Sequence, residues 1–465
     1  MLELRGDLVR DVKADWLRQH FEGDLLFTLR SRDEGGRAES AIDARRQRLM
    51  AAAKEFDLVD LEAKRDLDRT VLDSVPASKR IISWHGPSKG LSELQSLFAE
   101  MASEQARYYK IIPEAGRSRQ EMAPLALLHS LRRDDLIAFA SGSLGTWTRL
   151  VAPRLGAPVI FASAGSTPAA AGQLGLRQLI DDYQYPELGK IEHLFGLVGN
   201  GIEHSLSPRI HNWLYRQFDV PAVYIPFEIV EFGEFWLEIV ESGSFGVLGL
   251  PLAGLSVTSP HKRIASAIAG ARSPLVDLIG AANTLISRDH VWEAESTDGL
   301  GVVESLRAEG VTVRGCTVAV VGAGGAGRSA VVALSKSGAQ VTLVNRSVEP
   351  GQKASARLRV PFRSLEGFDP GEFDVLVHAT PLGLEADDPL PFEPSLLKSD
   401  AVLIDMVYTH EGPTQLVREA KSSAQIAIDG RLPLIYQAIP QFRLMTGCEA
   451  SAEDLRELVG LPPSR

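Results

Sequence analysis

Short apolar runs alternate with longer charged, amphipathic stretches from the start of the chain to about residue 180. Runs of this length predict β-strands, and the stretches between them predict crossover helices that return the chain to a parallel neighbour. The expected strands are Leu2–Leu4, Leu25–Leu29, Leu58–Leu61, Arg80–Trp84, Arg107–Ile112, Leu136–Ala140 and Pro158–Ala162. The expected helices include Glu39–Phe56, Leu91–Gln105, Ser118–Leu131 and Gly145–Leu155. The pattern therefore predicts a parallel α/β domain, either an open sheet or a closed barrel.

Polar side chains recur at or near the ends of these expected strands. They are Glu3, Arg5, Arg30, Glu34, Glu62, His85, Lys110 and, after a glycine-rich loop, Arg149. In a (β/α)₈ barrel the carboxyl ends of all strands converge on one mouth, where functional groups gather. The repetition favours a barrel with a polar site at that mouth.

The strand pattern restarts at Leu194–Val198 after a polar junction. Further along, the run Thr317–Val321 stops at a glycine turn, which is followed by a helical stretch, Arg328–Lys336, and a second run, Val341–Val344. Such a βαβ unit with the spacing G-x-G-x-x-G is typical of a dinucleotide site, because the turn approaches the pyrophosphate and the helix N-terminus attracts it. The expected contacts in the turn are Gly322, Gly324, Gly325, Ala326 and Gly327.

The residues after the second run indicate which nucleotide is bound. An NAD site expects Asp or Glu there, but this chain has Asn345, Arg346 and Ser347. A guanidinium at this place can pair with a 2′-phosphate, so we expect all three residues in an NADP site.

Composition limits the possible functions. The chain has 465 residues, enough for two to four domains, and its 60 acidic and 49 basic residues give a net charge of −11. That charge disfavours nucleic acid or an anionic membrane as the main partner. Two cysteines, Cys316 and Cys448, fit a reducing cytoplasm and exclude a disulfide scaffold. The sequence shows no metal-binding motif, no signal peptide and no apolar run of the ~20 residues that a membrane span needs.

Lys110 lies in the apolar and aromatic segment RYYKIIP. Desolvation there would lower the pKa of the lysine and leave a neutral amine that can attack a ketone. Taken alone, the residue is better explained as a lysine that extends from a strand end to solvent.

Two further patterns in the second half carry candidate chemistry. Ser205 and Ser207 alternate before Pro208, where an extended segment would direct both hydroxyls to one carboxylate. The alternative is an ordinary helix N-cap. Lys262 and Asp298 could form a proton-transfer pair in a cleft or a surface ion pair.

Residues 1 to about 190 resemble the type I 3-dehydroquinate dehydratases. The segments that carry the resemblance are LELRGD (Leu2–Asp7), TLRSRDEGG (Thr28–Gly36), Ser83-Trp84-His85, Lys110, Ser141–Arg149 and Gly172-Gln173. By this resemblance Lys110 forms a Schiff base with the substrate ketone, His85 shuttles protons and Glu34 orients His85. Arg149 binds the substrate carboxylate, and Glu3, Arg5, Arg30 and Gln173 complete the pocket.

The first half departs from that family in two places. Ala169 stands where the closing loop usually carries Ser or Thr. In addition, the chain begins inside what should be the second barrel strand, so the resemblance implies a (β/α)₈-type barrel without its first strand and helix.

Residues 194 to 447 resemble shikimate dehydrogenase. The matching segments are GNGIEHSLSPRIHN (Gly199–Asn212), GLSVTSPHK (Gly254–Lys262), GAANTL (Gly280–Leu285), STDGLG (Ser296–Gly301), the glycine turn, HATPLG (His378–Gly383) and DMVY (Asp405–Tyr408). By this resemblance Ser205 and Ser207 hold the substrate carboxylate, while Thr258, Asn283, Asp298 and Gln437 contact its hydroxyls. Lys262, paired with Asp298, assists proton transfer at the carbonyl oxygen, NADPH delivers the hydride, and Tyr408 lies close to the substrate.

This half also departs from its family. Gly201 replaces a usual Pro, Ser256 replaces the Asn of N-V-T, and His378 replaces the Asn of N-A-T-P. Glu349-Pro350 stands where a second basic residue is common, so selectivity for NADP is expected to depend mainly on Arg346.

Together the resemblances imply a cytoplasmic fused enzyme that dehydrates 3-dehydroquinate to 3-dehydroshikimate and reduces the product to shikimate. The expected domains are a barrel at 1–190, a substrate lobe at 191–300 completed by 430–465, and a Rossmann-type lobe at 301–429. Two alternatives remain: an active dehydrogenase with the truncated barrel as a docking module, and a ligand-sensing regulatory relative.

Overall fold

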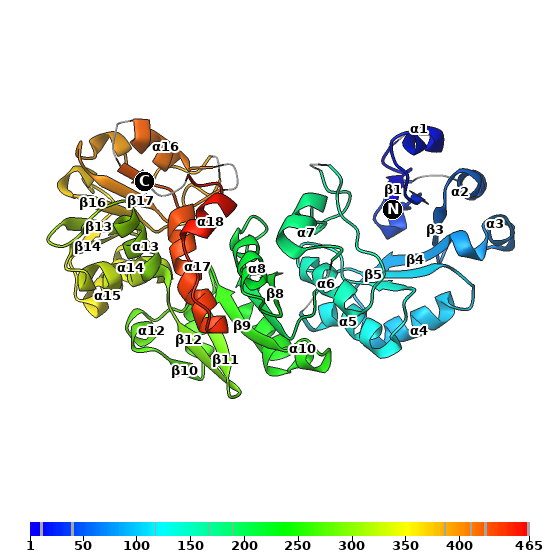
Figure 1. Cartoon of the computed structure of the whole chain (residues 1–465), viewed down its shortest axis with the longest axis horizontal. Helices are drawn as coiled ribbons and strands as arrows, with labels where there is room; N and C mark the ends of the chain where they lie inside the picture. The colour runs from blue at the N-terminus through cyan, green and yellow to red at the C-terminus, as the bar shows by residue number, and fades with distance from the viewer. Residues whose placement is uncertain are drawn as a thin grey trace. The chain divides into compact units, whose positions relative to one another are not determined.

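The computed structural model describes residues 1–9, 13–38, 41–116, 118–165, 167–187, 189–385, 387–409, 412–422 and 426–462. The chain divides into two compact units (Figure 1). The first comprises Met1–Ile180 and Glu234–Gly249, and the second comprises Asp181–Gly233 and Leu250–Arg465. The chain therefore leaves the first unit and returns to it once before the second unit is complete.

The first unit is built on one parallel sheet whose six strands pair in chain order. They are β1 (Leu2–Arg5), β2 (Leu25–Thr28), β3 (Leu58–Glu62), β4 (Arg80–Gly86), β5 (Tyr108–Pro113) and β6 (Leu136–Ala138). Every residue of β2, β3 and β6 is buried, as is usual for parallel strands covered on both faces. In register, Lys110 of β5 lies between Ser83 of β4 and Ile137 of β6.

Helices lie between these strands and after the last of them. They are α1 (Ala14–Arg18), η1 (Arg32–Glu34), α2 (Ile42–Glu55), α3 (Arg69–Ser74), η2 (Ala77–Lys79), α4 (Leu91–Met101), α5 (Ser118–Leu131), α6 (Thr146–Val151) and η3 (Ala152–Leu155). α7 (Leu176–Tyr183) carries the chain toward the second unit. The returning segment contains most of the short helical stretch α9 (Phe232–Phe235), η4 (Trp236–Glu241) and α10 (Ser244–Val247).

The expected parallel α/β architecture is confirmed, but one expected strand is wrong. The first six apolar runs form strands, whereas no strand includes Pro158–Ala162. Pro158 has no N–H to donate to a ladder, and the nearest β-pairing is an isolated bridge between Ser163 and Gly175. Among the described residues, the sheet therefore ends at β6.

The second unit contains two sheets. The first has the order β10-β12-β11-β9-β7-β8 and mixes parallel and antiparallel pairs. Its strands are β7 (His193–Gly199), β8 (Ala222–Glu228), β9 (Leu252–Val257), β10 (Ala271–Arg272), β11 (Thr284–Arg288) and β12 (Val291–Glu295). Its helices are α8 (Ser207–Gln217), α11 (Lys262–Ile268) and α12 (Pro274–Ile279).

The other sheet is entirely parallel, with the order β15-β14-β13-β16-β17-β18. The strands are β13 (Thr317–Val321), β14 (Gln340–Asn345), β15 (Phe362–Ser364), β16 (Val375–His378), β17 (Val402–Asp405) and β18 (Ile426–Ile428). The helices are α14 (Gly325–Lys336), α15 (Val348–Leu358), η5 (Pro370–Glu372), η6 (Pro394–Leu396) and α16 (Gln415–Ser422). This is the Rossmann strand order, with the switch point between β13 and β16, so the expected Rossmann-type sheet is confirmed.

The helices α13 (Asp298–Ala308) and α17 (Arg431–Thr446) join these two sheets into one unit. α13 packs against α14 and against α17, and α18 (Glu453–Leu458) follows α17 (Figure 1). The contact between α13 and α14 is close, because a Cβ at Gly299 would lie 2.3 Å from the carbonyl oxygen of Ser329. α13 thereby holds Asp298, its first residue, near the start of α14.

None of the helices in the described part of the chain has the length and apolar character of a membrane span. The same residues contain no cluster of His, Cys, Asp and Glu side chains suited to a metal ion.

Two candidate active sites

Lys110 is the centre of the first site. Its side chain leaves the middle of β5 and is only 6% exposed. Nζ lies 3.7 Å from Oδ2 of Asp60 and 4.3 Å from the centre of the Phe161 ring. Burial lowers the pKa of Lys110, although Asp60 and Glu3 oppose the change. The environment thus increases the share of neutral, nucleophilic amine at a given pH.

His85 and Glu34 form a pair beside this lysine. Nδ1 of His85 lies 3.1 Å from Oε2 of Glu34, and the backbone N–H of His85 donates to the same oxygen at 3.1 Å. Burial lowers the pKa of His85 well below its usual value, and the cations Arg30 and Lys110 add to the effect. Burial also raises the pKa of Glu34 to about 8, against the influence of Arg30. The imidazole is therefore neutral near pH 7 and able to accept a proton.

Arg30 connects the groups of the first site. Its guanidinium donates to Glu34 at 2.9 Å, to Asp60 at 2.8 Å and to Ser83 at 2.9 Å. Burial alone would lower the pKa of Arg30, but the surrounding carboxylates outweigh burial and raise it. The structure thus brings Lys110, His85, Glu34 and Arg30 into one connected cluster.

The other residues expected in this site have local partners. Glu3 accepts from the Thr28 hydroxyl at 2.6 Å, and Arg5 donates to both oxygens of Asp7 at 2.9 and 2.8 Å. The Arg149 guanidinium lies 4.3 Å from the Phe139 ring centre, and burial lowers the pKa of Arg149 to about 10. Oε1 of Gln173 accepts from the backbone N–H of Ala169 at 3.0 Å. Gln173 therefore ties its own loop at the position where the hydroxyl side chain is missing.

Asp60 and Ser83 belong to the cluster but were not predicted as site residues. The Ser83 hydroxyl donates to Asp60 at 2.5 Å, and both side chains are almost fully buried. The available signal was a polar residue within an apolar strand, in VDLE and IISW.

The second site is built around Lys262 and Asp298. Nζ of Lys262 lies 2.7 Å from Oδ2 of Asp298, and the other carboxylate oxygen accepts from Nδ2 of Asn283 at 3.1 Å. Nδ2 of Asn283 also lies 3.1 Å from Oε1 of Gln437. Four expected residues, from α11, α13, α17 and the turn before β11, therefore meet at one place.

Thr297 is a member of this cluster that was not predicted. Its hydroxyl accepts from Asn283 at 2.9 Å, and its backbone N–H donates to Oδ1 of Asn283 at 2.9 Å. These bonds fix the amide orientation of Asn283. Thr297 precedes Asp298 in the segment STDG, where a polar residue before a helix start was the only signal.

The two serines do not lie in an extended segment, so that expectation is wrong. Leu206 between them is helical, with φ −82° and ψ −6°, and Ser207 is the first residue of α8. Oγ of Ser205 accepts from the backbone N–H of Ser207 at 3.2 Å and lies 3.4 Å from the Tyr408 hydroxyl. The helix-cap alternative is wrong as well, because the N-cap residue of α8 is Leu206, which makes no side-chain cap hydrogen bond. Tyr408 lies beside Ser205.

Thr258 directly follows β9, and a backbone hydrogen bond fixes its position. Its N–H donates to the carbonyl oxygen of Val198 at 2.9 Å, at the end of β7. A Cβ at Gly199 would lie 2.3 Å from Cγ2 of Thr258, so the glycine admits this side chain.

The glycine turn has the backbone geometry of its motif. Gly322 has φ +122°, a conformation that favours glycine, and a Cβ at Gly327 would lie 1.9 Å from the carbonyl oxygen of Gly322. By contrast, no atom would lie within 4 Å of a Cβ at Gly324. The helix begins at Gly325, three residues earlier than expected, because Gly325, Ala326 and Gly327 form its first turn. A Cβ at Gly325 would lie 3.2 Å from the Lys262 side chain, so the turn and the lysine are neighbours.

Three residues expected to contact the cofactor lie at the end of β14 and directly after it. Oδ1 of Asn345 accepts from the backbone N–H of Ala323 at 3.1 Å, and Nδ2 donates to the carbonyl oxygen of Ser347 at 2.8 Å. Asn345 therefore supports the turn through its side chain. Arg346 is exposed, and Ser347 immediately precedes α15.

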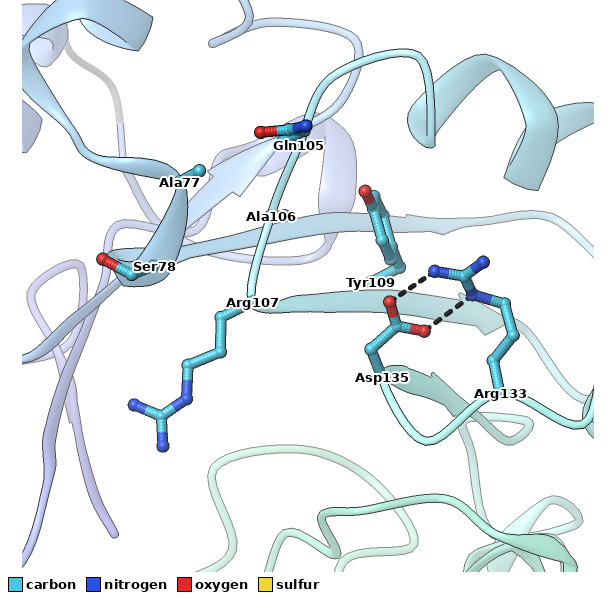
Figure 2. A pocket seen from close by; sticks show the side chains of 8 residues that line it. All are labelled: Ala77, Ser78, Gln105, Ala106, Arg107, Tyr109, Arg133 and Asp135. Carbon is cyan, nitrogen blue, oxygen red and sulfur yellow. Dashed lines mark hydrogen bonds and ion pairs between the residues drawn. The ribbon is translucent and has the colours of Figure 1, made fainter.

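A separate cavity lies at the amino-terminal ends of β4, β5 and β6 (Figure 2). Its polar lining includes the pair Arg133 and Asp135, joined by two hydrogen bonds of 2.7 and 2.6 Å. Functional groups of parallel α/β folds gather at the opposite, carboxyl ends of strands, so we assign this cavity no catalytic role.

Comparison with known proteins agrees with this division into two sites. Residues 1–189 match the type I 3-dehydroquinase family, and residues 197–285 match the shikimate dehydrogenase substrate binding domain. The bifunctional 3-dehydroquinate dehydratase/shikimate dehydrogenase of Arabidopsis thaliana is 28% identical over 97% of this chain and 79% of its own length.

Relatives of the second half alone are also similar. A shikimate dehydrogenase (NADP(+)) of Methanothrix thermoacetophila is 33% identical over 57% of this chain and 96% of its own length. The crystal structure of shikimate dehydrogenase from Aquifex aeolicus superposes with a TM-score of 0.54 at 31% identity, over 59% of this chain and all of that one. The chain is therefore a fusion of a type I 3-dehydroquinase domain with a member of the shikimate dehydrogenase family.

Proposed function

We propose that the first unit dehydrates 3-dehydroquinate to 3-dehydroshikimate and that the second reduces 3-dehydroshikimate to shikimate with NADPH. The observation that carries this proposal is the presence of two clusters of charged and polar side chains, one around buried Lys110 and one around the Lys262–Asp298 pair. The product of the first reaction is the substrate of the second, which gives the fusion a chemical rationale.

In the dehydratase, the neutral amine of Lys110 adds to the substrate ketone, and the resulting hydroxyl takes up a proton from solvent and leaves as water, which gives an iminium. The iminium acidifies the adjacent C–H, and Nε2 of His85 takes that proton while Glu34 holds Nδ1. The neighbouring C–O bond breaks, and the hydroxyl leaves as water with the proton held by His85. Hydrolysis of the iminium then releases 3-dehydroshikimate and restores Lys110.

The remaining residues of the first site bind the substrate. Arg149 keeps its charge at neutral pH and has Nε without a protein partner, so we assign it the substrate carboxylate. Glu3, Arg5, Arg30 and Gln173 line the pocket in this proposal.

In the dehydrogenase, Lys262 donates a proton to the carbonyl oxygen of 3-dehydroshikimate, and Asp298 holds the ammonium in position. Ser205 and Ser207 bind the substrate carboxylate at the start of α8. Thr258, Asn283 and Gln437 contact its hydroxyls, and Tyr408 lies beside them.

The nucleotide turn fits NADPH. The space around Gly324 and the start of α14 leave backbone N–H groups open to a pyrophosphate, with Gly322, Gly325, Ala326 and Gly327 around them. Bound NADPH supplies the hydride for the carbonyl carbon. Asn345 and Ser347 flank Arg346, whose exposed guanidinium is the group we assign to the 2′-phosphate.

Arg346→Ala tests the cofactor assignment. We expect NADPH binding to weaken by roughly 10-fold to 100-fold and NADH binding to change by less than about twofold, because only NADPH carries the phosphate. The matched control is Lys353→Ala, an exposed cation on α15. Equal loss of both nucleotides would contradict the assignment.

We further infer the domain limits from these sites. The dehydratase domain would span 1–190, with the six described parallel strands as its sheet. The substrate lobe would span 191–300 and 430–465, and the Rossmann lobe 301–429.

One assay separates this proposal from its alternatives. The purified chain is given 3-dehydroquinate and NADPH, and NADPH oxidation is followed. Oxidation is expected in the native chain. Lys110→Ala should abolish it from 3-dehydroquinate and keep it from 3-dehydroshikimate, whereas Lys262→Ala should abolish both. Oxidation only from 3-dehydroshikimate in the native chain would indicate an inactive first unit, and none from either substrate would indicate a ligand-sensing protein.

A further inference from the structure

A buried chain of hydrogen bonds lies at the carboxyl ends of β16 and β17. Nδ1 of His378 lies 2.9 Å from Oδ1 of Asp405, and Nε2 lies 2.6 Å from Oγ1 of Thr380. The other oxygen of Asp405 accepts from the Thr414 hydroxyl at 2.6 Å. His378 and Asp405 have no exposed surface. The proposed reactions use none of these four side chains.

The partners fix the tautomer of His378. The Asp405 carboxylate can only accept, so Nδ1 carries the proton, and in the neutral imidazole Nε2 offers a lone pair. The Thr380 hydroxyl then donates to Nε2, while Oγ1 accepts from the backbone N–H of Leu382 at 3.3 Å. The donor and the acceptor of each hydrogen bond in this series are therefore defined, and together the bonds fix the orientation of the Thr380 hydroxyl.

The loop that Thr380 begins lies against the nucleotide turn. The backbone N–H of Ala379 donates to the carbonyl oxygen of Val321 at 2.8 Å. A Cβ at Gly322 would lie 2.5 Å from the carbonyl oxygen of Ala379 and 3.1 Å from Cγ2 of Thr380. Ala379 and Thr380 therefore form a wall in contact with the first glycine of the turn.

The Asp405 end of this hydrogen-bond network lies close to residues that we expect to bind the substrate. Oδ1 of Asp405 also accepts from the backbone N–H of Val407 at 2.9 Å. The next residue is Tyr408, whose hydroxyl lies 3.4 Å from Oγ of Ser205. One buried network thus fixes two loops, one at the nucleotide turn and one beside Ser205.

We propose that His378 is a positioning residue for the nucleotide, acting through the Thr380 hydroxyl to hold Ala379 and Thr380 against the glycine turn. The inference rests on the proposed use of NADPH by this unit. It adds a residue that is not among the expected contacts at Gly322–Gly327 and Asn345–Ser347.

Two substitutions remove the same hydrogen bond from opposite sides. His378→Asn keeps a donor where Nδ1 meets Asp405 but has no atom at the place of Nε2. Thr380→Val removes the hydroxyl and keeps the shape of the side chain. Each should weaken NADPH binding, measured by direct fluorescence titration, by about fivefold to tenfold, the usual effect of losing one buried hydrogen bond.

The double variant and a conservative variant complete the test. Because both changes delete one interaction, His378→Asn combined with Thr380→Val should weaken binding no more than either change alone. Thr380→Ser keeps the hydroxyl and should bind NADPH within about twofold of the native chain. Thermal unfolding is measured for all variants.

Several outcomes would overturn the proposal. They are unchanged NADPH affinity in Thr380→Val, losses that multiply in the double variant, and a lower unfolding temperature with native affinity, which would indicate a purely structural role. Failure of the proposed function is distinguishable, because a native chain that binds NADPH without reducing 3-dehydroshikimate still permits the binding comparison.

Discussion

Lys110 and Lys262 show how the same side chain is prepared for two different tasks. Lys110 is buried beside an aromatic ring and lies 3.7 Å from Asp60. The Asp60 carboxylate accepts hydrogen bonds from Arg30 and Ser83. Lys262 lies at 2.7 Å from Asp298, within hydrogen-bond distance. The first environment favours the neutral amine that the proposed dehydratase reaction needs, and the second holds Lys262 against Asp298 as the proposed proton donor to substrate.

Asp60→Asn should lower the pKa of Lys110 further. Asp60 is the strongest group that opposes the effect of burial on this lysine, so its neutralisation removes a stabiliser of the ammonium. We expect the pH midpoint of borohydride trapping with 3-dehydroquinate to fall by about one unit. Asp43→Asn, at an exposed position on α2, is the control. An upward shift would show that Asp60 does not act on Lys110 in this way.

The residues of the first site were predictable where they followed the strand pattern. His85 lies near the end of β4 and Glu34 follows β2, as the pattern predicted, whereas Lys110 lies in the middle of β5. The structure brings the three together. Asp60 was not predicted, because nothing in an apolar strand shows which face a polar residue occupies or which cation it meets. The conformation of Ser205 and Ser207 depends on where α8 begins, which their alternation alone did not determine.

The strand, turn and helix around Gly322–Gly327 depend on two glycines in different ways. Gly327→Ala would place a methyl group 1.9 Å from the Gly322 carbonyl oxygen, whereas Gly324→Ala meets no atom within 4 Å. We expect Gly327→Ala to lower the unfolding temperature and to abolish NADPH binding. Gly324→Ala should unfold like the native chain and bind NADPH more weakly, because its methyl group occupies space left for the pyrophosphate.

Thermal unfolding and nucleotide titration of both variants check this prediction. A Gly324→Ala chain that is as unstable as Gly327→Ala would contradict it.

Helix α5 carries a buried carboxyl that makes stability depend on pH. Glu121 accepts from Nε1 of Trp147 at 3.1 Å, and burial, with Glu234 and Glu238 nearby, raises its pKa to about 7 from the usual 4.5. Between those two values the folded chain keeps a proton that the unfolded chain has lost. The contribution of Glu121 to the free energy of unfolding is therefore fully present below pH 4.5 and decreases as the pH rises to 7.

Glu121→Gln should reduce this decline, since the amide cannot ionise and its oxygen can still accept from Trp147. Urea unfolding at pH 5 and pH 8 measures the difference, and Glu22→Gln, at an exposed position, is the control. Part of the decline should remain, because Glu34 has a raised pKa of the same sign. An unchanged difference between the two pH values would contradict the prediction.

The elements themselves were predicted well where hydrophobic periodicity was strong. β13, β14 and the six strands of the first sheet were expected, and α5 has the bounds that its periodicity indicated. Pro158–Ala162 was not distinguishable from a strand by composition, since strand formation there requires a hydrogen-bonded neighbour. The start of α14 was predicted too late, because glycines in a first helical turn resemble a loop in sequence.

At the scale of the whole molecule, Glu234–Gly249 belongs to the first compact unit although it lies within the residues that match the substrate binding domain. Phe245 of this segment is 1% exposed, and its ring centre lies 5.5 Å from that of Trp147 in α6. The segment therefore completes the core around Trp147, a role that no sequence pattern indicated.

Phe245→Ala should destabilise the first unit by about 3–5 kcal/mol, the usual cost of truncating a buried phenylalanine. We expect dehydratase activity to be lost at a lower temperature than in the native chain, while NADPH binding by the second unit persists. Val247→Ala, at a position 71% exposed on the same short helix, is the control. Loss of NADPH binding with native dehydratase stability would contradict the prediction.

The course of the chain limits how the two activities can be separated. It crosses between the units after Ile180, after Gly233 and after Gly249. A single break in the backbone, by a protease or by splitting the gene, leaves at least one unit composed of two different polypeptides. To obtain two independent enzymes, the segment Glu234–Gly249 would have to be moved to the polypeptide of the first unit, in addition to cutting the chain. The fusion of the two units in one polypeptide is therefore needed for the fold of the first unit.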